Sequence, residues 1–241
     1  HPLFLFFHNY DLHSKYGEVQ CGGCDLPYYP PNESFLHFSK EIPEPKTLRA
    51  PQRPRATELL FAAREERETI SPEELEFMIA MYDDAIRGVD EAVAQTFANL
   101  KDMGIYDDAL IVVTSDHGEH FGEHGEYLHE HLYEGSARVP LFIKFPHGEY
   151  AGKRVAELVQ LIDIMPTILD VVGLPAPPCD GQSLLPIIRG ERAAAPWAFI
   201  RRLRNVAVRN REWKYIRNIG TGDRALYHIA VDPAETVNVL H

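Results

Sequence analysis

The chain begins with an uninterrupted apolar run. Residues 3–7 (LFLFF) are apolar, and the polar stretch HNYDLH follows them. A short apolar run that ends in polar residues is typical of a strand buried on both faces. We therefore predict a strand whose C-terminal end presents polar side chains. Residues 17–58 carry most of the early Gly and Pro residues, which predicts a long irregular connection.

A helical pattern starts at Ser71. The segment SPEE pairs Ser71 with Glu74 as a capping box and places Pro72 at the first helical position. Apolar residues then recur three or four positions apart as far as Leu100, which is the period of one helix face. Gly104 is typical of a helix end. Together these features predict one long amphipathic helix.

Shorter elements follow the long helix. Residues 109–113 (ALIVV) and 138–146 (RVPLFIKFP) predict strands, and residues 155–175 predict a strand or turn leading into a short helix. After residue 190, short apolar runs alternate with Arg-rich turns, which predicts an antiparallel hairpin or small sheet. We expect an α/β fold in which residues 1–190 form part of a mainly parallel sheet flanked by helices. Residues 191–241 would form a small antiparallel β subdomain.

Composition excludes some functions. The 241 residues carry a net charge of −12, which argues against nucleic acid as a partner. No apolar run reaches the roughly 18 residues that a membrane helix needs, so we expect no membrane span. The three cysteines are too few for a four-Cys zinc site, so Cys21 and Cys24 predict a local disulfide or two free thiols. Because the chain starts at His1 and enters an apolar run at once, we interpret it as a piece of a longer protein.

Five of the twelve histidines lie between residues 117 and 131, among many carboxylates. Asp116 and His117 come directly after the predicted strand ALIVV, where both side chains can face one crevice. A carboxylate oxygen with an imidazole nitrogen makes half of a divalent-metal site. The glutamates of this stretch are expected to be solvated. A solvated acidic loop that is merely rich in histidine is the alternative interpretation.

A second cluster lies near the start of the chain. The segment HNYDLHSKY places His8, Asp11 and His13 at the end of the first predicted strand. Two strand ends would therefore each present imidazoles. Such a repetition favours a site over isolated surface histidines.

Several segments, in this order, resemble the sulfatase family of the alkaline phosphatase superfamily. They are HNYDLHSKY, YDDAIRGVDEAVAQTFANLKDMGIYDD, ALIVVTSDHGEHFGEHG with LYEGSARVPLFIKFP, VQLIDIMPTILDVVGLP with DGQSLLPIIRG, and WKYIRN with LYHIAVDPAETVN. Each motif alone is of low specificity, but their order and spacing are highly specific. The resemblance covers nearly the whole chain and implies an alkaline phosphatase-like fold and the hydrolysis of sulfuric esters.

The resemblance also implies roles for individual residues. Asp116 and His117 match a pair of metal ligands, and the metal would be one divalent ion, with calcium favoured and magnesium, manganese or zinc as alternatives. His13 matches a histidine that contacts the sulfate group, and His8 lies beside it. His129 falls where many members have a sulfate-binding lysine, and His131 is the alternative candidate for that role. We therefore expect His13 and His129 to be catalytic, and His8, His13, His129 and His131 to bind the substrate.

One part of the family pattern is absent from the chain. Family members carry in their N-terminal half a tandem Asp pair that completes the metal site and a Cys-x-Pro-x-Arg motif or its Ser version, and residues 1–241 contain no match to that part of the pattern. We therefore expect this chain to match the C-terminal half of a sulfatase, with the formylglycine nucleophile supplied by an upstream segment. On its own the chain should be inactive, and an exposed sheet edge could allow homo-oligomers.

Three functions follow from these observations. The leading one is a sulfatase-type hydrolase acting on a small-molecule or glycan sulfate ester. A metal-dependent phosphodiesterase or phosphonate monoester hydrolase of the same superfamily is the first alternative. A non-catalytic module of that fold is the second.

Overall fold

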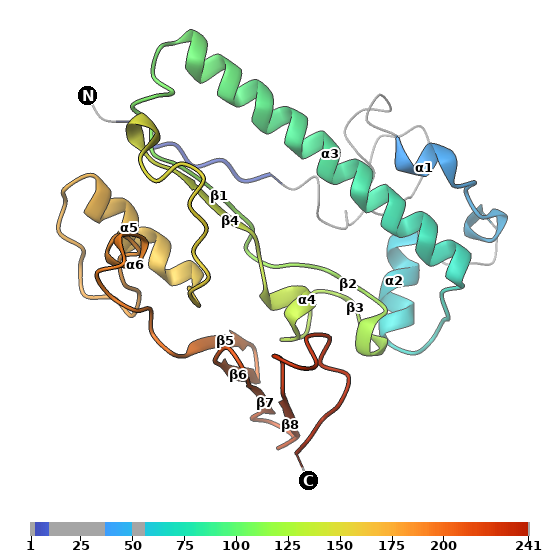
Figure 1. Cartoon of the computed structure of the whole chain (residues 1–241). Helices are drawn as coiled ribbons and strands as arrows, with labels where there is room; N and C mark the ends of the chain where they lie inside the picture. Colours follow the sequence, from blue (N-terminus) through green and yellow to red (C-terminus); the bar gives the residue numbers. More distant parts are fainter. Residues whose placement is uncertain (1–2, 10–36, 50–55, 241) are drawn as a thin grey trace. The chain divides into compact units, whose positions relative to one another are not determined.

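A computed structural model of the chain describes residues 3–9, 37–49 and 56–240 (Figure 1). The chain divides into two compact units. The first comprises residues 1–106 and 121–128, and the second comprises residues 107–120 and 129–241. Among the described helices, none is both long enough and apolar enough to cross a bilayer.

The long helix of the first unit is α3 (Pro72–Asp102). The Ser71 hydroxyl accepts a hydrogen bond from the backbone N–H of Glu74 at 3.2 Å, and the Glu74 carboxylate accepts one from the N–H of Ser71 at 2.8 Å. This reciprocal capping satisfies two N–H groups that the helix itself leaves without partners. The predicted helix and its capping box are confirmed.

Smaller elements accompany α3 in the first unit. They are α1 (Phe38–Glu41), the 3-10 turn η2 (Lys46–Arg49), α2 (Ala56–Arg64) and β3 (Tyr127–Leu128). The partner of β3 in a two-stranded ladder is β2 (His120–Phe121). The sequence predicted an irregular connection over residues 17–58, where α1, η2 and the start of α2 lie, because the prolines nearby obscured these short helical segments. The rest of that connection lies outside the described residues.

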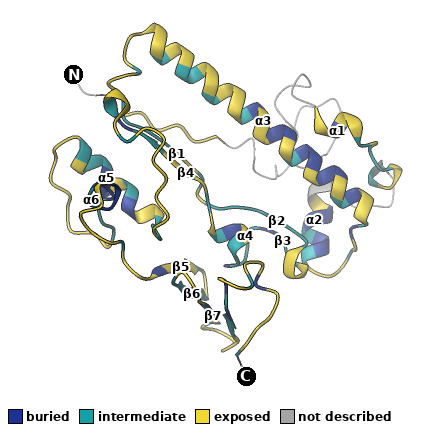
Figure 2. Cartoon of the chain, in the orientation of Figure 1, coloured by how far each residue is buried: buried dark blue, intermediate teal, exposed yellow. Residues whose placement is uncertain are grey.

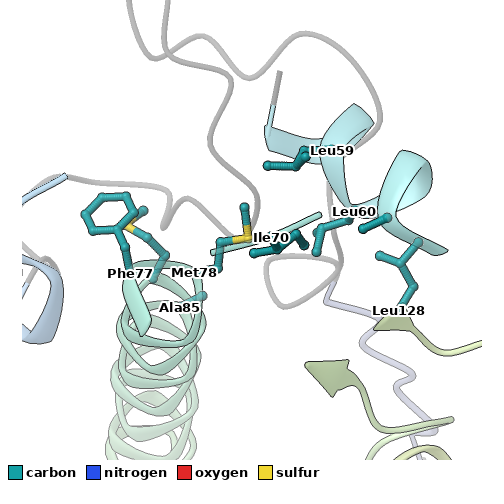
Figure 3. Close-up of a cluster of buried hydrophobic side chains, with 9 residues drawn as sticks. Leu59, Leu60, Ile70, Phe77, Met78, Ala85 and Leu128 are labelled. Carbon is teal, nitrogen blue, oxygen red and sulfur yellow. The ribbon is translucent and has the colours of Figure 1, made fainter. Parts of the chain in front are cut away.

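The core of the first unit brings α2, α3 and β3 together (Figure 3). Leu59 and Leu60 of α2 are fully buried, as is Met78 of α3. Each such side chain contributes about 1.5–3 kcal/mol when it leaves water. The whole cluster consists of Leu59, Leu60, Ala63, Ile70, Phe77, Met78, Met81, Ala85 and Leu128.

In the second unit, β1 (Ile111–Thr114) pairs with β4 (Leu141–Lys144) in antiparallel register, Ile111 opposite Lys144. The helices of this unit are α4 (Glu134–Ala137), α5 (Ile164–Val171) and α6 (Leu185–Arg189). Its buried cluster consists of Phe145, Leu184, Leu185, Ile187 and Ile188. The strands predicted at 109–113 and 138–146 and the short helix after Asp163 are confirmed.

The last strands form a four-stranded antiparallel sheet in the order β5-β6-β7-β8. These strands are β5 (Ala198–Arg202), β6 (Asn205–Arg209), β7 (Lys214–Asn218) and β8 (Arg224–Tyr227). The α/β class and the C-terminal antiparallel sheet are therefore confirmed. The boundary near residue 190 stays a prediction.

Two expectations about the first strands differ from the structure. Residues 3–9 form no strand, and the side chains of residues 3–7 are 63–82% exposed. The reason is physical, because a strand is held by ladder hydrogen bonds and none of the described strands pairs with this segment. In the described part of the chain the β1–β4 pair is antiparallel, so a mainly parallel sheet is not seen there.

Candidate functional site

The candidate site starts where β1 ends. Ser115, Asp116 and His117 follow Thr114 directly, and the Ser115 hydroxyl donates to the carbonyl oxygen of His117 at 2.5 Å. The backbone N–H of His117 donates to Asp116 Oδ1 at 3.1 Å. These local hydrogen bonds fold the chain into a tight turn that presents two adjacent functional side chains.

The two side chains face each other across a short distance. His117 Nε2 lies 3.8 Å from Asp116 Oδ1, and the Asp116 side chain is 69% exposed. His117 Nδ1 lies 2.9 Å from the carbonyl oxygen of Gly118, which makes Nδ1 the donor nitrogen. Nε2 then carries the lone pair, which is the state that a metal ligand needs.

Close backbone packing fixes the turn that follows. The N–H of Gly118 donates to the carbonyl oxygen of Ser136 at 2.8 Å, and a Cβ at Gly118 would lie 2.0 Å from the carbonyl oxygen of Gly135. His120 is 1% exposed, and its Nδ1 lies 2.8 Å from the Ser136 hydroxyl. The start of α4 therefore holds residues 118–120 in place.

His129 stacks on His117. The ring centroids are 4.0 Å apart and the planes differ by 20°. His129 Nδ1 lies 3.4 Å from each carboxylate oxygen of Glu119, and the exposed fractions of these side chains are 12% for His129 and 4% for Glu119. The structure thus brings the predicted metal ligand and the predicted anion-binding imidazole into contact.

A buried charge network supports α4. The Glu134 carboxylate accepts from Lys214 Nζ at 3.0 Å and from the Arg209 guanidinium. Lys214 is fully buried and also lies 3.0 Å from Glu235, whose other oxygen accepts from the N–H of Glu134 at 2.6 Å. Burial by itself raises the pKa of Glu134, but Lys214 and Arg209 outweigh it, so the pKa lies below its ordinary value. The ionised network ties the loop after His131 to β6 and β7.

The donor set at the end of β1 fits part of a divalent-metal site. Ligands bind such ions at about 2.0–2.6 Å, so two ligand atoms separated by up to about twice that distance can share one ion. The 3.8 Å between Asp116 Oδ1 and His117 Nε2 meets this condition. Within residues 3–9, 37–49 and 56–240, no group of three or more His, Cys, Asp or Glu residues could hold a metal. Asp116 and His117 therefore fit as two ligands of an incomplete set.

The other predicted residues fall in different places. His131 is half-buried and its ring lies 6.2 Å from that of Tyr133. His8 belongs to the first unit and is exposed, and His13 lies outside the described residues. The substrate-binding roles of His8, His13 and His131 stay predictions.

Two site residues were missed by sequence reasoning. Glu119 and His120 were expected at the loop surface, but the structure buries both side chains. Composition could not reveal this, because acidic loop residues are usually solvated. The sequence feature that could have indicated this burial is the nearby Gly118, because a residue without a side chain permits close packing.

Comparison with known proteins identifies the class. Residues 1–174 match the family described as Sulfatase, and residues 122–241 match the family described as N-sulphoglucosamine sulphohydrolase, C-terminal. The chain belongs to the sulfatase family.

Three relatives illustrate the match. Arylsulfatase K of Bos taurus is 31% identical over 170 residues, which covers 62% of this chain and 31% of the relative. The multifunctional alkaline phosphatase superfamily protein PehA of Trinickia caryophylli is 40% identical over 123 residues, covering 50% of this chain and 24% of the relative. The crystal structure of the phosphonate monoester hydrolase of Agrobacterium radiobacter superposes with a TM-score of 0.63 and 31% identity, covering 70% of this chain and 38% of that one. The chain thus spans a third or less of the length of the two curated relatives.

Proposed function

We propose that this chain is part of an enzyme that hydrolyses sulfuric esters and depends on a divalent metal. The stack of His117 on His129, with ring centroids 4.0 Å apart, carries the proposal, because it supports one imidazole that would bind the metal and a neighbouring one that would bind the anion. Membership of the sulfatase family supports the same chemistry. The substrate would be a small-molecule or glycan sulfate ester.

Each residue would have a separate task. Asp116 and His117 would hold one divalent ion, with calcium favoured, and the ion would neutralise charge on the sulfate oxygens. His129 would bind the ester, with His131 as the alternative candidate, and His8 and His13 remain proposed substrate-binding residues. A histidine in place of lysine donates a hydrogen bond to an anion from both ring nitrogens only when both are protonated, so its binding of an anion depends on pH.

The fold of the complete enzyme is part of the proposal. We expect residues 3–9 and β1 to belong to a mainly parallel sheet there, with the antiparallel β subdomain beginning near residue 191. The high exposure of residues 3–7 supports this arrangement, because so many apolar side chains require a covering partner. A nucleophile in the form of formylglycine would come from an upstream segment.

Phosphorus chemistry is the second candidate. It is favoured by the likeness to the phosphonate monoester hydrolase of Agrobacterium radiobacter, which is 31% identical. An Asp and a His after a strand would serve a phosphonate or phosphodiester oxygen equally well. The identity of the nucleophile separates the two functions.

The first test is mass spectrometry of the protein isolated from its source, combined with turnover assays. Formylglycine upstream of residue 1, with faster turnover of 4-nitrophenyl sulfate than of a phenylphosphonate ester, would support the sulfatase. The reverse preference with an unmodified nucleophile would establish the alternative. Turnover of neither ester would favour a non-catalytic module, and turnover by residues 1–241 alone would contradict the need for an upstream segment.

A second test addresses the metal ligands. Asp116→Asn should weaken calcium binding by the full-length protein about tenfold or more, because one carboxylate ligand is lost. Asp108→Asn is the matched control, since Asp108 Oδ1 lies 3.5 Å from His147 Nδ1 in an exposed Asp-His pair outside the site. Equal losses in both variants would argue against a metal site at Asp116.

A further inference from the structure

Glu119 has an unusual environment for a carboxylate in a loop. Its side chain is 4% exposed, while the chain as a whole is acidic and most of its carboxylates are solvated. Burial of an ionised carboxylate costs several kcal/mol unless donors surround it. Glu119 therefore needs a hydrogen-bond donor that offsets the cost of its burial.

That partner is His129. Both Glu119 oxygens lie 3.4 Å from His129 Nδ1, so the nitrogen sits centrally over the carboxylate. Among the described residues, no other side chain is found within hydrogen-bonding or ion-pair distance of Glu119. The length of 3.4 Å does not argue against a catalytic role, because catalytic hydrogen bonds are often long in the absence of substrate.

The contact determines which nitrogen of His129 carries the hydrogen. A carboxylate only accepts hydrogen bonds, so Nδ1 must be the donor nitrogen. Nε2, on the opposite side of the ring, then points away from Glu119. The stack on His117, with ring centroids 4.0 Å apart, restrains the His129 ring in the direction perpendicular to its plane.

We propose that Glu119 is a positioning residue, which sets the orientation and the tautomer of His129 and so directs Nε2 toward the ester. The part that concerns the ester rests on the proposed function, whereas the orientation and tautomer follow from the contact itself. A carboxylate that orients a histidine through Nδ1 is a general device in catalysis.

The chain supplies a matched control one residue from His129. Glu130 is also an acid in this stretch, but its carboxylate binds Arg202, with Oε2 3.0 Å from Nε and 2.5 Å from Nη2. Glu130→Leu therefore removes a neighbouring charge without touching the Nδ1 contact. His147, which lies 3.5 Å from Asp108 in an exposed pair, serves as an internal reference.

Nitrogen-15 NMR of histidine-labelled chain measures the tautomer directly. At about pH 9, above the range in which imidazoles usually titrate, His129 of the unmodified chain should carry its hydrogen on Nδ1. Glu119→Leu should shift the hydrogen to Nε2, whereas Glu119→Gln, which keeps an accepting oxygen, should retain it largely on Nδ1. Glu130→Leu and the signals of His147 should show no change.

Two results would overturn the inference. One is an unmodified chain in which His129 carries its hydrogen on Nε2, a measurement that requires no variant to fold. The other is an equal shift of the His129 signals in Glu119→Leu and Glu130→Leu.

Turnover by the full-length protein separates this inference from the proposed function. Glu119→Leu should lower kcat/KM for 4-nitrophenyl sulfate about tenfold, as expected for a lost hydrogen bond to a charged group, with Glu119→Gln retaining more activity and Glu130→Leu nearly all. A tautomer shift in Glu119→Leu without any loss of turnover would confirm the positioning contact and overturn the role of His129 in the proposed function.

Discussion

At the scale of single residues, the site depends on positions whose chemistry the sequence shows only in part. Asp116 and His117 could be predicted as candidate ligands because they follow a β-branched strand, and Asp116 Oδ1 lies 3.8 Å from His117 Nε2 in the structure. Glu119 could not, because the side chain that its buried carboxylate contacts, His129, lies ten positions later in the chain. Neighbouring acids in one loop thus have opposite environments that composition alone does not separate.

Gly118→Ala should destabilise the second unit. The added Cβ would lie 2.0 Å from the carbonyl oxygen of Gly135, which belongs to backbone and cannot rotate away. We expect a loss of about 3 kcal/mol or more in the free energy of unfolding, at the upper end of overpacking effects. Gly148→Ala, where nothing lies within 4 Å but φ is +72°, is the control and should lose only about 1–2 kcal/mol. Urea denaturation of the variants measures both, and equal losses would contradict the clash.

Asp84 should make the first unit sensitive to acid. Burial raises its pKa, but hydrogen bonds from the Ser39 hydroxyl and from the N–H groups of His37, Phe38 and Ser39 outweigh it, so the pKa is lowered. The unfolded chain, with a pKa of about 3.9, then binds more protons in acid. The stabilisation is therefore complete above about pH 4–5 and is lost as the pH falls through the folded-state pKa.

Asp84→Asn should remove this pH dependence and cost about 1.5–3 kcal/mol near neutral pH. Asp83 provides a control of opposite sign, because burial and the charge of Asp84 raise its pKa. Asp83→Asn should leave stability at neutral pH unchanged or slightly higher. Thermal unfolding followed between neutral and acid pH tests both variants, and a parallel loss in the two would contradict the assignment.

At the scale of elements, local sequence patterns predicted the helices and strands that depend mainly on local sequence. The capping box and the helical period of apolar residues predicted α3, and the short apolar runs predicted β1, β4 and the C-terminal strands. The pairing of β1 with β4 could not be predicted as antiparallel, because an apolar strand pattern carries no information on the direction of its neighbour. The short helix α2 was missed because Pro-rich sequence precedes it.

Lys214→Met should destabilise the C-terminal sheet and α4 together. Lys214 is fully buried between Glu134 and Glu235, so its removal leaves Glu235 without its cation and leaves Glu134 with Arg209 alone. We expect a loss of about 3–5 kcal/mol in the free energy of unfolding. Arg211→Met breaks the exposed Arg211–Glu157 pair and should lose less than about 1 kcal/mol. Guanidinium denaturation compares the two, and a small effect of Lys214→Met would show that the network adds little.

At the scale of the whole molecule, this chain carries the acidic loop and the C-terminal sheet of a sulfatase but leaves apolar surface uncovered. The side chains of residues 3–7 are exposed, although the sequence predicted them as the interior of a sheet. The sequence was informative about their chemistry and not about their surroundings, because a sheet requires strands that the described residues do not supply.

We predict that the isolated chain self-associates through residues 3–7. Exposed apolar segments of this size favour association because burial of each large side chain contributes about 1.5–3 kcal/mol. Phe4→Lys combined with Phe6→Lys should shift the chain toward monomer in multi-angle light scattering. Phe199→Lys, at a similarly exposed position in β5, is the control. A monodisperse monomer of the unmodified chain would contradict the prediction.

The two halves of α3 differ in burial. Its buried residues run from Glu74 to Gly88, and the fourteen residues after Gly88 are half-buried or exposed (Figure 2). A single helix, about 46 Å long at 1.5 Å per residue, thus has one half held by side-chain packing and one half held mainly by its own hydrogen bonds. Hydrogen–deuterium exchange should record two rates along it, with amides up to residue 88 opening only when the first unit unfolds and those beyond exchanging by local fraying from the C-terminal end.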